Sequence, residues 1–223
     1  METLVDELAT RAKMDPIAYR LKLLSSDATK LRACLALLEE KSATWRKNVP
    51  RNHAVGIACH ESFETGVACA VEVSIEDKRP RIHRATIAVD PGVAVNPLTI
   101  ESQMQGGLGF GVTQLMANGA ITLKNGRVEQ RNFDGYTPPY MKDAPVAVDV
   151  HIVSSTEKPS GCGTARPGNR AGGCQCAGEA HREALPQPAI GNDIGHLIFI
   201  GNGENIVRTR SLLRQFGECR RGG

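Results

Sequence analysis

The N-terminal part of the chain carries apolar side chains at the spacing of amphipathic helices. Residues 3–13 place several of them on one face, namely Leu4, Val5, Leu8 and Ala12. Thr3 and Asp6 at the start of this run have the spacing of a capping box in which Asp replaces the usual Glu. A second helix is predicted from Asp15, which can cap it, with Pro16 at the first helical position. A third is predicted over residues 28–41, followed by Trp45 as a packing residue.

The pattern then changes to the alternation of apolar and polar residues that is typical of strands. A short apolar strand is predicted at 55–59. The runs 67–75 and 81–89 flank a charged turn and predict an antiparallel hairpin. Asn125-Gly126 lies between two alternating runs and predicts a second hairpin, because both residues tolerate positive φ. Residues 146–153 form a last strand, so the fold class is α+β, with an antiparallel or mixed sheet and helices packed on one face.

Residues 96–116, NPLTIESQMQGGLGFGVTQLM, have a helical pattern despite four glycines. Asn96 can cap this helix, and each internal glycine costs about 1 kcal/mol relative to alanine. Gln103, Gly107 and Gly111 follow one another at intervals of four residues, which makes a surface without side chains beside an amide. Such a surface admits either a neighbouring backbone in close packing or a flat polar ligand.

The composition of the chain excludes several classes of protein but does not indicate a particular function. The 223 residues suffice for one large or two small domains, and 41% of them are hydrophobic. We see no apolar run long enough to span a membrane and no signal peptide, so the cytoplasm is the default compartment and the periplasm the open alternative. Seven cysteines, an odd number, do not predict a disulfide framework. The net charge of +3 is too small to indicate nucleic acid, which leaves the arginine-rich C-terminal end as a weak candidate for it.

Four stretches in order, residues 2–24, 55–75, 81–116 and 120–153, resemble the C-terminal part of a molybdenum hydroxylase large subunit. The family is xanthine dehydrogenase/aldehyde oxidase, and the branch is that of the isoquinoline 1-oxidoreductase beta subunit. The resemblance implies that Gln103 hydrogen-bonds a molybdenum–molybdopterin cofactor and that Gly106 and Gly107 let the cofactor or its supporting loop approach. It also implies that the pterin holds the metal, so no protein ligand to a metal is predicted.

The same resemblance implies the partners. They are an iron–sulfur small subunit, the upstream part of the large subunit and an aldehyde or N-heterocycle substrate. We therefore expect a molybdopterin-binding portion of an oxidoreductase that hydroxylates its substrate with water and is not active alone. The alternative is a non-catalytic relic or scaffold domain of the same fold.

The chain departs from the family pattern after the last predicted strand. Gly161 and Gly163 match a glycine-rich family motif, but Thr164 stands where the family has its glutamate general base. A threonine hydroxyl is far too weakly basic to replace a carboxylate, so no catalytic residue is assigned. From Gly161 to Ala184 the chain also lacks every large apolar side chain. We interpret this as a reading-frame shift near residue 161 or a decaying gene; if no one- or two-base change at the locus restores the motif, the idea is wrong.

The predicted organisation is therefore a partial molybdopterin-binding domain at 1–160, an apolar-poor irregular segment at 161–189 and a basic tail at 190–223. Two other polar residues have ordinary explanations. His60 precedes Glu61 without the second histidine of a zinc motif, which favours a hydrogen-bonded strand-end residue. Asp90 precedes Pro91-Gly92 and is predicted to organise that turn through the backbone.

Overall fold

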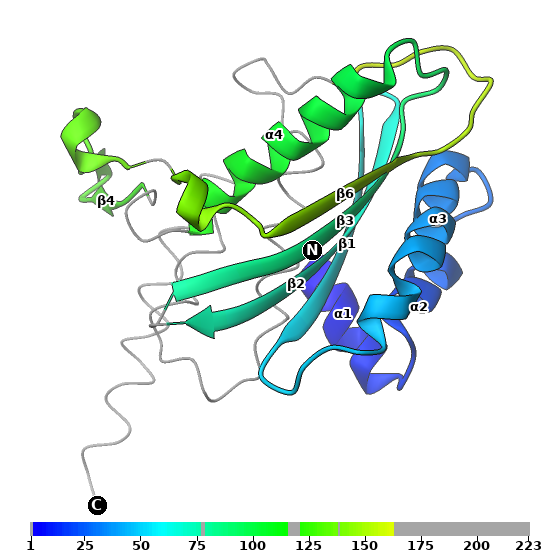
Figure 1. Cartoon of the computed structure of the whole chain (residues 1–223), viewed down its shortest axis with the longest axis horizontal. Helices are drawn as coiled ribbons and strands as arrows, with labels where there is room; N and C mark the ends of the chain where they lie inside the picture. Colours follow the sequence, from blue (N-terminus) through cyan, green and yellow to red (C-terminus); the bar gives the residue numbers. More distant parts are fainter. Residues whose placement is uncertain (1, 77–78, 116–120, 138, 163–223) are drawn as a thin grey trace, which may run out of the picture.

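The computed structural model describes residues 2–76, 79–115, 121–137 and 139–162 (Figure 1). Thr164, the apolar-poor segment beyond residue 162, the proposed frame shift and the basic tail lie outside these residues. The elements in chain order are α1 Glu2–Arg11, α2 Pro16–Leu23, α3 Thr29–Arg46, β1 Ala54–Ser62, β2 Thr65–Glu76, β3 Arg79–Asp90, α4 Pro97–Leu115, β4 Leu123–Lys124, β5 Arg127–Val128, the 3-10 turns η2 Phe133–Gly135 and η3 Met141–Asp143, and β6 Ala147–Ile152. Across the described part of the chain, no helix has the length and hydropathy needed to cross a membrane.

The main sheet has the strand order β1-β2-β3-β6, and β4 and β5 form a separate two-stranded sheet. Both pairings within β1–β3 are antiparallel, so the predicted hairpin of 67–75 with 81–89 is confirmed. β6 pairs with β3 in parallel, which requires the long connection that contains α4. The α+β class with a mixed sheet is therefore confirmed.

Helices lie on both faces of this sheet, so the prediction that they pack on one face alone is wrong (Figure 1). The N-terminal helices share one face, where Ile17, Leu35 and Leu38 pack against β1 and β2. α4 lies on the opposite face and buries its own apolar side chains against β2 and β3. Because successive strand residues point to opposite faces, β2 supplies both layers, and its even and odd positions enter different clusters.

The predicted start of α2 is confirmed by its hydrogen bonds. The Asp15 carboxylate accepts from the backbone N–H of Ile17 at 2.8 Å and of Ala18 at 3.1 Å. α3 runs beyond the predicted end at residue 41 and contains Trp45. The indole Nε1 donates to the Thr86 hydroxyl at 3.1 Å, so contact with the sheet extends this helix past its polar last turns.

The predicted capping box of Thr3 and Asp6 is wrong. α1 begins at Glu2, so Thr3 lies inside the helix. Asp6 is buried and accepts a hydrogen bond from the backbone N–H of Ile57 at 3.3 Å, while Glu2 accepts from Cys59 N–H at 2.9 Å. These carboxylates satisfy backbone donors along β1, which is an edge strand, and so a tertiary contact replaces the local cap.

Candidate functional site

The glycine-rich helix α4 is anchored by apolar side chains that recur every four residues. Ile100, Met104, Leu108 and Val112 are all buried in the cluster shared with the sheet. Burying such side chains contributes about 1.5–3 kcal/mol each. That gain exceeds the roughly 4 kcal/mol that four helical glycines cost, so the helix persists without further support from its glycines.

The three predicted cofactor-binding residues differ in their surroundings. Gln103 is half-buried, and within the described part of the chain its side-chain amide makes no hydrogen bond. Gly106 is exposed, and a Cβ added to it would meet no atom within 4 Å. Gly107 is buried, as is Gly111. Gly107 and Gly111 are thus enclosed, whereas an open surface lies beside Gly106.

After β6 the chain crosses the ends of the strands as a strap, residues 153–162. Backbone hydrogen bonds attach it to the loop after β3: Val93 N–H donates to Glu157 C=O at 3.0 Å, and Ser160 N–H donates to Pro91 C=O at 2.7 Å. The Thr65 hydroxyl lies 2.7 Å from that of Ser160 and donates to Gly161 C=O at 2.9 Å. The strap is therefore fixed to the β1–β2 turn as well as to the β3 end.

Its last described residue, Cys162, is half-buried and packs against the core cluster that α4 shares with the sheet. The strap thus carries the chain to the α4 side of the sheet just before Thr164. No sequence pattern indicates the anchors Thr65 and Ser160, because they are distant in the chain and neither belongs to a recognisable motif.

Gly92 lies beneath the strap in a conformation that suits only glycine. Its φ is +77°, and a Cβ would come within 2.3 Å of the Lys158 carbonyl oxygen. The preceding Asp90 is buried and accepts a hydrogen bond from Gly92 N–H at 3.0 Å, which confirms its predicted role in the turn. The strap packs directly against this turn.

Replacing Gly92 with alanine is expected to destabilise the protein and displace the strap. The left-handed conformation costs an L-residue about 1–2 kcal/mol, and the Cβ contact with Lys158 adds to it. Gly126 is the matched control, because its φ is +76° but its Cβ would meet nothing within 4 Å. In urea unfolding monitored by circular dichroism, G92A should lose more stability than G126A; equal losses would show that the strap contact does not matter.

The histidines in the described part of the chain do not assemble a metal site. Within the described ranges, no group of three or more His, Cys, Asp or Glu side chains is placed to hold a metal ion. Burial lowers the pKa of His60, which fits a neutral strand residue. The His53 and His83 rings stack with centroids 4.0 Å apart, and His53 Nδ1 lies 2.6 Å from the Glu72 carboxylate. The sequence missed this stack, because it depends on the pairing of β2 with its neighbours.

Two cysteines of the sheet, Cys59 and Cys69, are structural rather than nucleophilic. Cys69 is fully buried and Cys59 is half-buried. Burial raises the pKa of each thiol to about 12. Since the thiolate is the reactive form, neither is poised for covalent chemistry near neutral pH.

Comparison with known sequences gives one family and two informative relatives. The family model described as "molybdopterin cofactor-binding domain" matches residues 13–145. The chain is 28% identical to the membrane-bound aldehyde dehydrogenase [pyrroloquinoline-quinone] of Gluconacetobacter polyoxogenes, over 96% of this chain and 28% of that protein. It is 26% identical to isoquinoline 1-oxidoreductase subunit beta of Brevundimonas diminuta, over 72% of this chain and 21% of that protein. The chain thus spans under a third of either relative.

Solved structures support the fold. The aldehyde oxidoreductase of Desulfovibrio gigas superposes with a TM-score of 0.60 over 82% of this chain and 38% of that one, at 12% identity. The aldehyde oxidoreductase of Desulfovibrio desulfuricans gives 0.57 over 82% and 37%, also at 12% identity. At this identity the likeness concerns the arrangement of helices and strands alone.

Proposed function

The chain belongs to the molybdopterin cofactor-binding domain family, and from that premise we propose that α4 forms one wall of a molybdopterin site. Gln103 is the proposed hydrogen-bonding residue. Gly106 provides the open approach, and Gly107 lets the helix pack closely against its support. The molybdenum itself would be held by the pterin.

The observation that carries this proposal is the pairing of an unused amide with an open glycine. An amide has two donors and one acceptor, and a half-buried one that bonds to no described residue leaves hydrogen-bonding capacity for a ligand. Three residues on, the helix backbone at Gly106 is open to a flat group, since no side chain stands within 4 Å of its Cβ position. A pterin is planar and rich in donors and acceptors, so the residues present fit such a group.

When bound, the cofactor would supply the redox chemistry by which this family hydroxylates a substrate with water. The residues of this chain would bind and orient it: Gln103 through its amide, and the α4 backbone through contact. No residue here is assigned to proton transfer, because Thr164 stands at the position of the family's general base. We propose an aldehyde or N-heterocycle as the substrate class, supported by the names of both relatives.

The remaining parts of a complete enzyme would come from elsewhere. The chain spans 28% and 21% of the two relatives, so the upstream part of a large subunit is the first proposed partner and an iron–sulfur subunit is the second. In this arrangement residues 1–160 are the partial cofactor domain, residues 161–189 an irregular segment and residues 190–223 a basic tail.

A non-catalytic scaffold of the same fold is the second candidate, and Thr164 favours it. Loss of the glutamate removes the proton acceptor without disturbing the two core clusters.

The extent of the alignment bears on the frame-shift explanation for that loss. Because 96% of the chain aligns with the aldehyde dehydrogenase, the alignment continues well past residue 162, which a shifted frame does not predict.

Replacing Gln103 with leucine tests the cofactor proposal. Loss of one amide hydrogen bond, which contributes about 0.5–1.5 kcal/mol, should weaken pterin retention about twofold to tenfold. The readout is the fluorescence of oxidised pterin released from protein purified after molybdenum-replete co-expression with its neighbouring genes. Thermal unfolding should change little, since the side chain is half-buried and unpartnered.

Gln105→Leu is the matched control. Gln105 is exposed on the same helix and already bonds to Glu101 at 3.3 Å. Equal pterin content in the two variants would remove Gln103 from the site. A folded wild-type protein that carries no pterin beside its partner subunits would instead favour the scaffold.

A further inference from the structure

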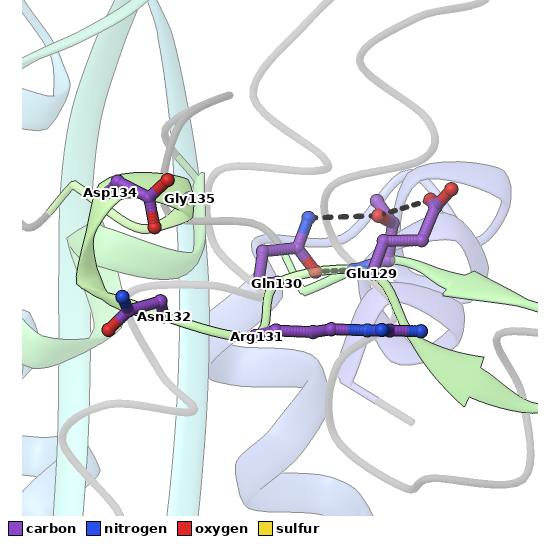
Figure 2. Close-up of a pocket in the computed structure, with 7 residues that line it drawn as sticks. Glu129, Gln130, Arg131, Asn132, Asp134 and Gly135 are labelled. Atoms are coloured by element: carbon purple, nitrogen blue, oxygen red, sulfur yellow. Dashed lines mark hydrogen bonds between the residues drawn. The ribbon is translucent and has the colours of Figure 1, made fainter.

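The β4–β5 hairpin carries a groove that the molybdopterin proposal does not use. The groove has a volume of about 600 Å³ and is lined by Lys124, Asn125, Arg127, Val128, Glu129 and Arg131. It adjoins a cavity of about 390 Å³ that shares Glu129 and Arg131. Figure 2 shows that second cavity, with the Arg131 side chain extended alongside the hairpin strands.

The groove has an unbalanced positive charge. Lys124 and Arg127 are direct partners across the hairpin, and like charges in directly opposite positions destabilise a strand pair. The side chains of Lys124, Arg127 and Arg131 make no ion pair or hydrogen bond with any described residue. The one acid in the groove, Glu129, already accepts a hydrogen bond from the Thr122 hydroxyl at 2.7 Å. The three cations are thus exposed, adjacent and unpaired within the described part of the chain.

The backbone that presents these cations is well defined. Asn125 and Gly126 have φ values of 51° and 76°, the positive angles of a tight hairpin turn. Beyond the two-residue strands, Glu129 N–H donates to Thr122 C=O at 2.9 Å. The Gln130 amide bonds twice to Thr122, accepting from its N–H at 2.8 Å and donating to its hydroxyl at 2.9 Å (Figure 2). These bonds fix the register of the hairpin, so the repulsion between Lys124 and Arg127 is not relieved by slipping.

We propose that this groove binds a phosphate-type oxyanion, either as free phosphate or pyrophosphate or as the phosphate group of a larger molecule. Two guanidinium groups and an ammonium match such a ligand, because guanidinium forks bond phosphate oxygens bidentately. Binding would also neutralise the like-charge pair that the hairpin otherwise carries. The proposal is independent of the cofactor site on α4.

Calorimetric titration of the purified chain tests it with inorganic phosphate, pyrophosphate and a nucleoside diphosphate. Pyrophosphate is expected to bind saturably, and a higher salt concentration should weaken it. The double variant R127A/R131A should weaken binding at least tenfold. The double variant R11A/R51A is the control, because it removes the same charge from two other exposed positions. Circular dichroism checks that both variants fold, which is expected because the altered residues lie outside both core clusters.

The three titrations also distinguish free phosphate or pyrophosphate from the phosphate group of a larger molecule. Equal affinity for pyrophosphate and the nucleoside diphosphate indicates recognition of the phosphate group alone, whereas tighter binding of the nucleotide indicates a larger ligand; both support the site. The proposal is overturned if pyrophosphate does not bind saturably, or if the two double variants weaken binding equally.

Discussion

Replacing Arg20 with methionine is expected to lower the free energy of unfolding by about 3–5 kcal/mol. The side chain is only 3% exposed. Its Nε donates to Glu2 at 2.9 Å, Nη1 donates to Asp6, and Nη2 donates to Ile57 C=O at 2.7 Å. Methionine keeps most of the volume but leaves the Asp6 carboxylate buried without its cation. Removing one partner of a buried ion pair costs far more than the pair itself contributes.

The guanidinium remains charged throughout the accessible pH range. Burial by itself would lower the pKa of Arg20, but the charge and hydrogen bond of Asp6, assisted by Glu2, outweigh it and raise the pKa above its usual value. The loss in R20M is therefore expected at all pH values at which the acids are ionised. Urea unfolding followed by circular dichroism measures it.

Two further variants test whether the loss of stability in R20M comes from the buried ion pair. Arg46→Met also removes a partly buried arginine, but its partners Asp15 and Glu39 are 42% and 46% exposed, so the loss should stay near or below about 1 kcal/mol. Adding Asp6→Leu to R20M should restore much of the stability, since apolar replacement of a whole buried pair is often neutral. If R20M were no worse than R46M, the network of Arg20 would not hold α1 and α2 to β1.

The parts of the fold that the sequence predicted are those that local energetics determine. Asp15 and Pro16 specify the start of a helix through interactions that span only four residues. Asn125-Gly126 specifies a hairpin, because both adopt the positive φ that its turn requires. The alternation along β2 and β3 identified their hairpin, because each strand must place one set of side chains into each layer.

The parts that were missed depend on contacts between distant segments. Asp6 fits a local capping pattern, yet its partners Arg20 and Ile57 lie 14 and 51 residues away. The path of the chain over α4 likewise determines two further features. They are the parallel pairing of β6 with β3 and the packing of the strap against Gly92. No short motif encodes such contacts.

For the candidate site, a usable signal was present but not applied. The apolar positions of α4 determine which side of the helix faces the sheet. Gly107 lies three residues after Met104 and so falls near that side, whereas Gly106 lies two residues after it and falls away from it. Grouping the glycines as one bare surface overlooked this division. The role of Gln103 came from the family resemblance, and its position in the structure is compatible with that role.

Replacing Gly106 with leucine should separate stability from cofactor binding. Because Gly106 is exposed and open, the substitution should stabilise α4 by about 0.5–1 kcal/mol through helix propensity alone. If a pterin lies against this backbone, the same side chain occupies its place. Retention should then fall more than in Q103L, which loses hydrogen bonds but keeps the space.

The pterin and molybdenum content of G106L, measured together with its unfolding temperature after co-expression with its partner subunits, tests the central claim most directly. We expect G106L to have an unfolding temperature equal to or higher than that of wild type and a pterin content close to background. Gln105→Leu should keep the wild-type pterin content. A G106L protein as stable as expected that still carries wild-type pterin and molybdenum would contradict the assignment of this surface to the cofactor.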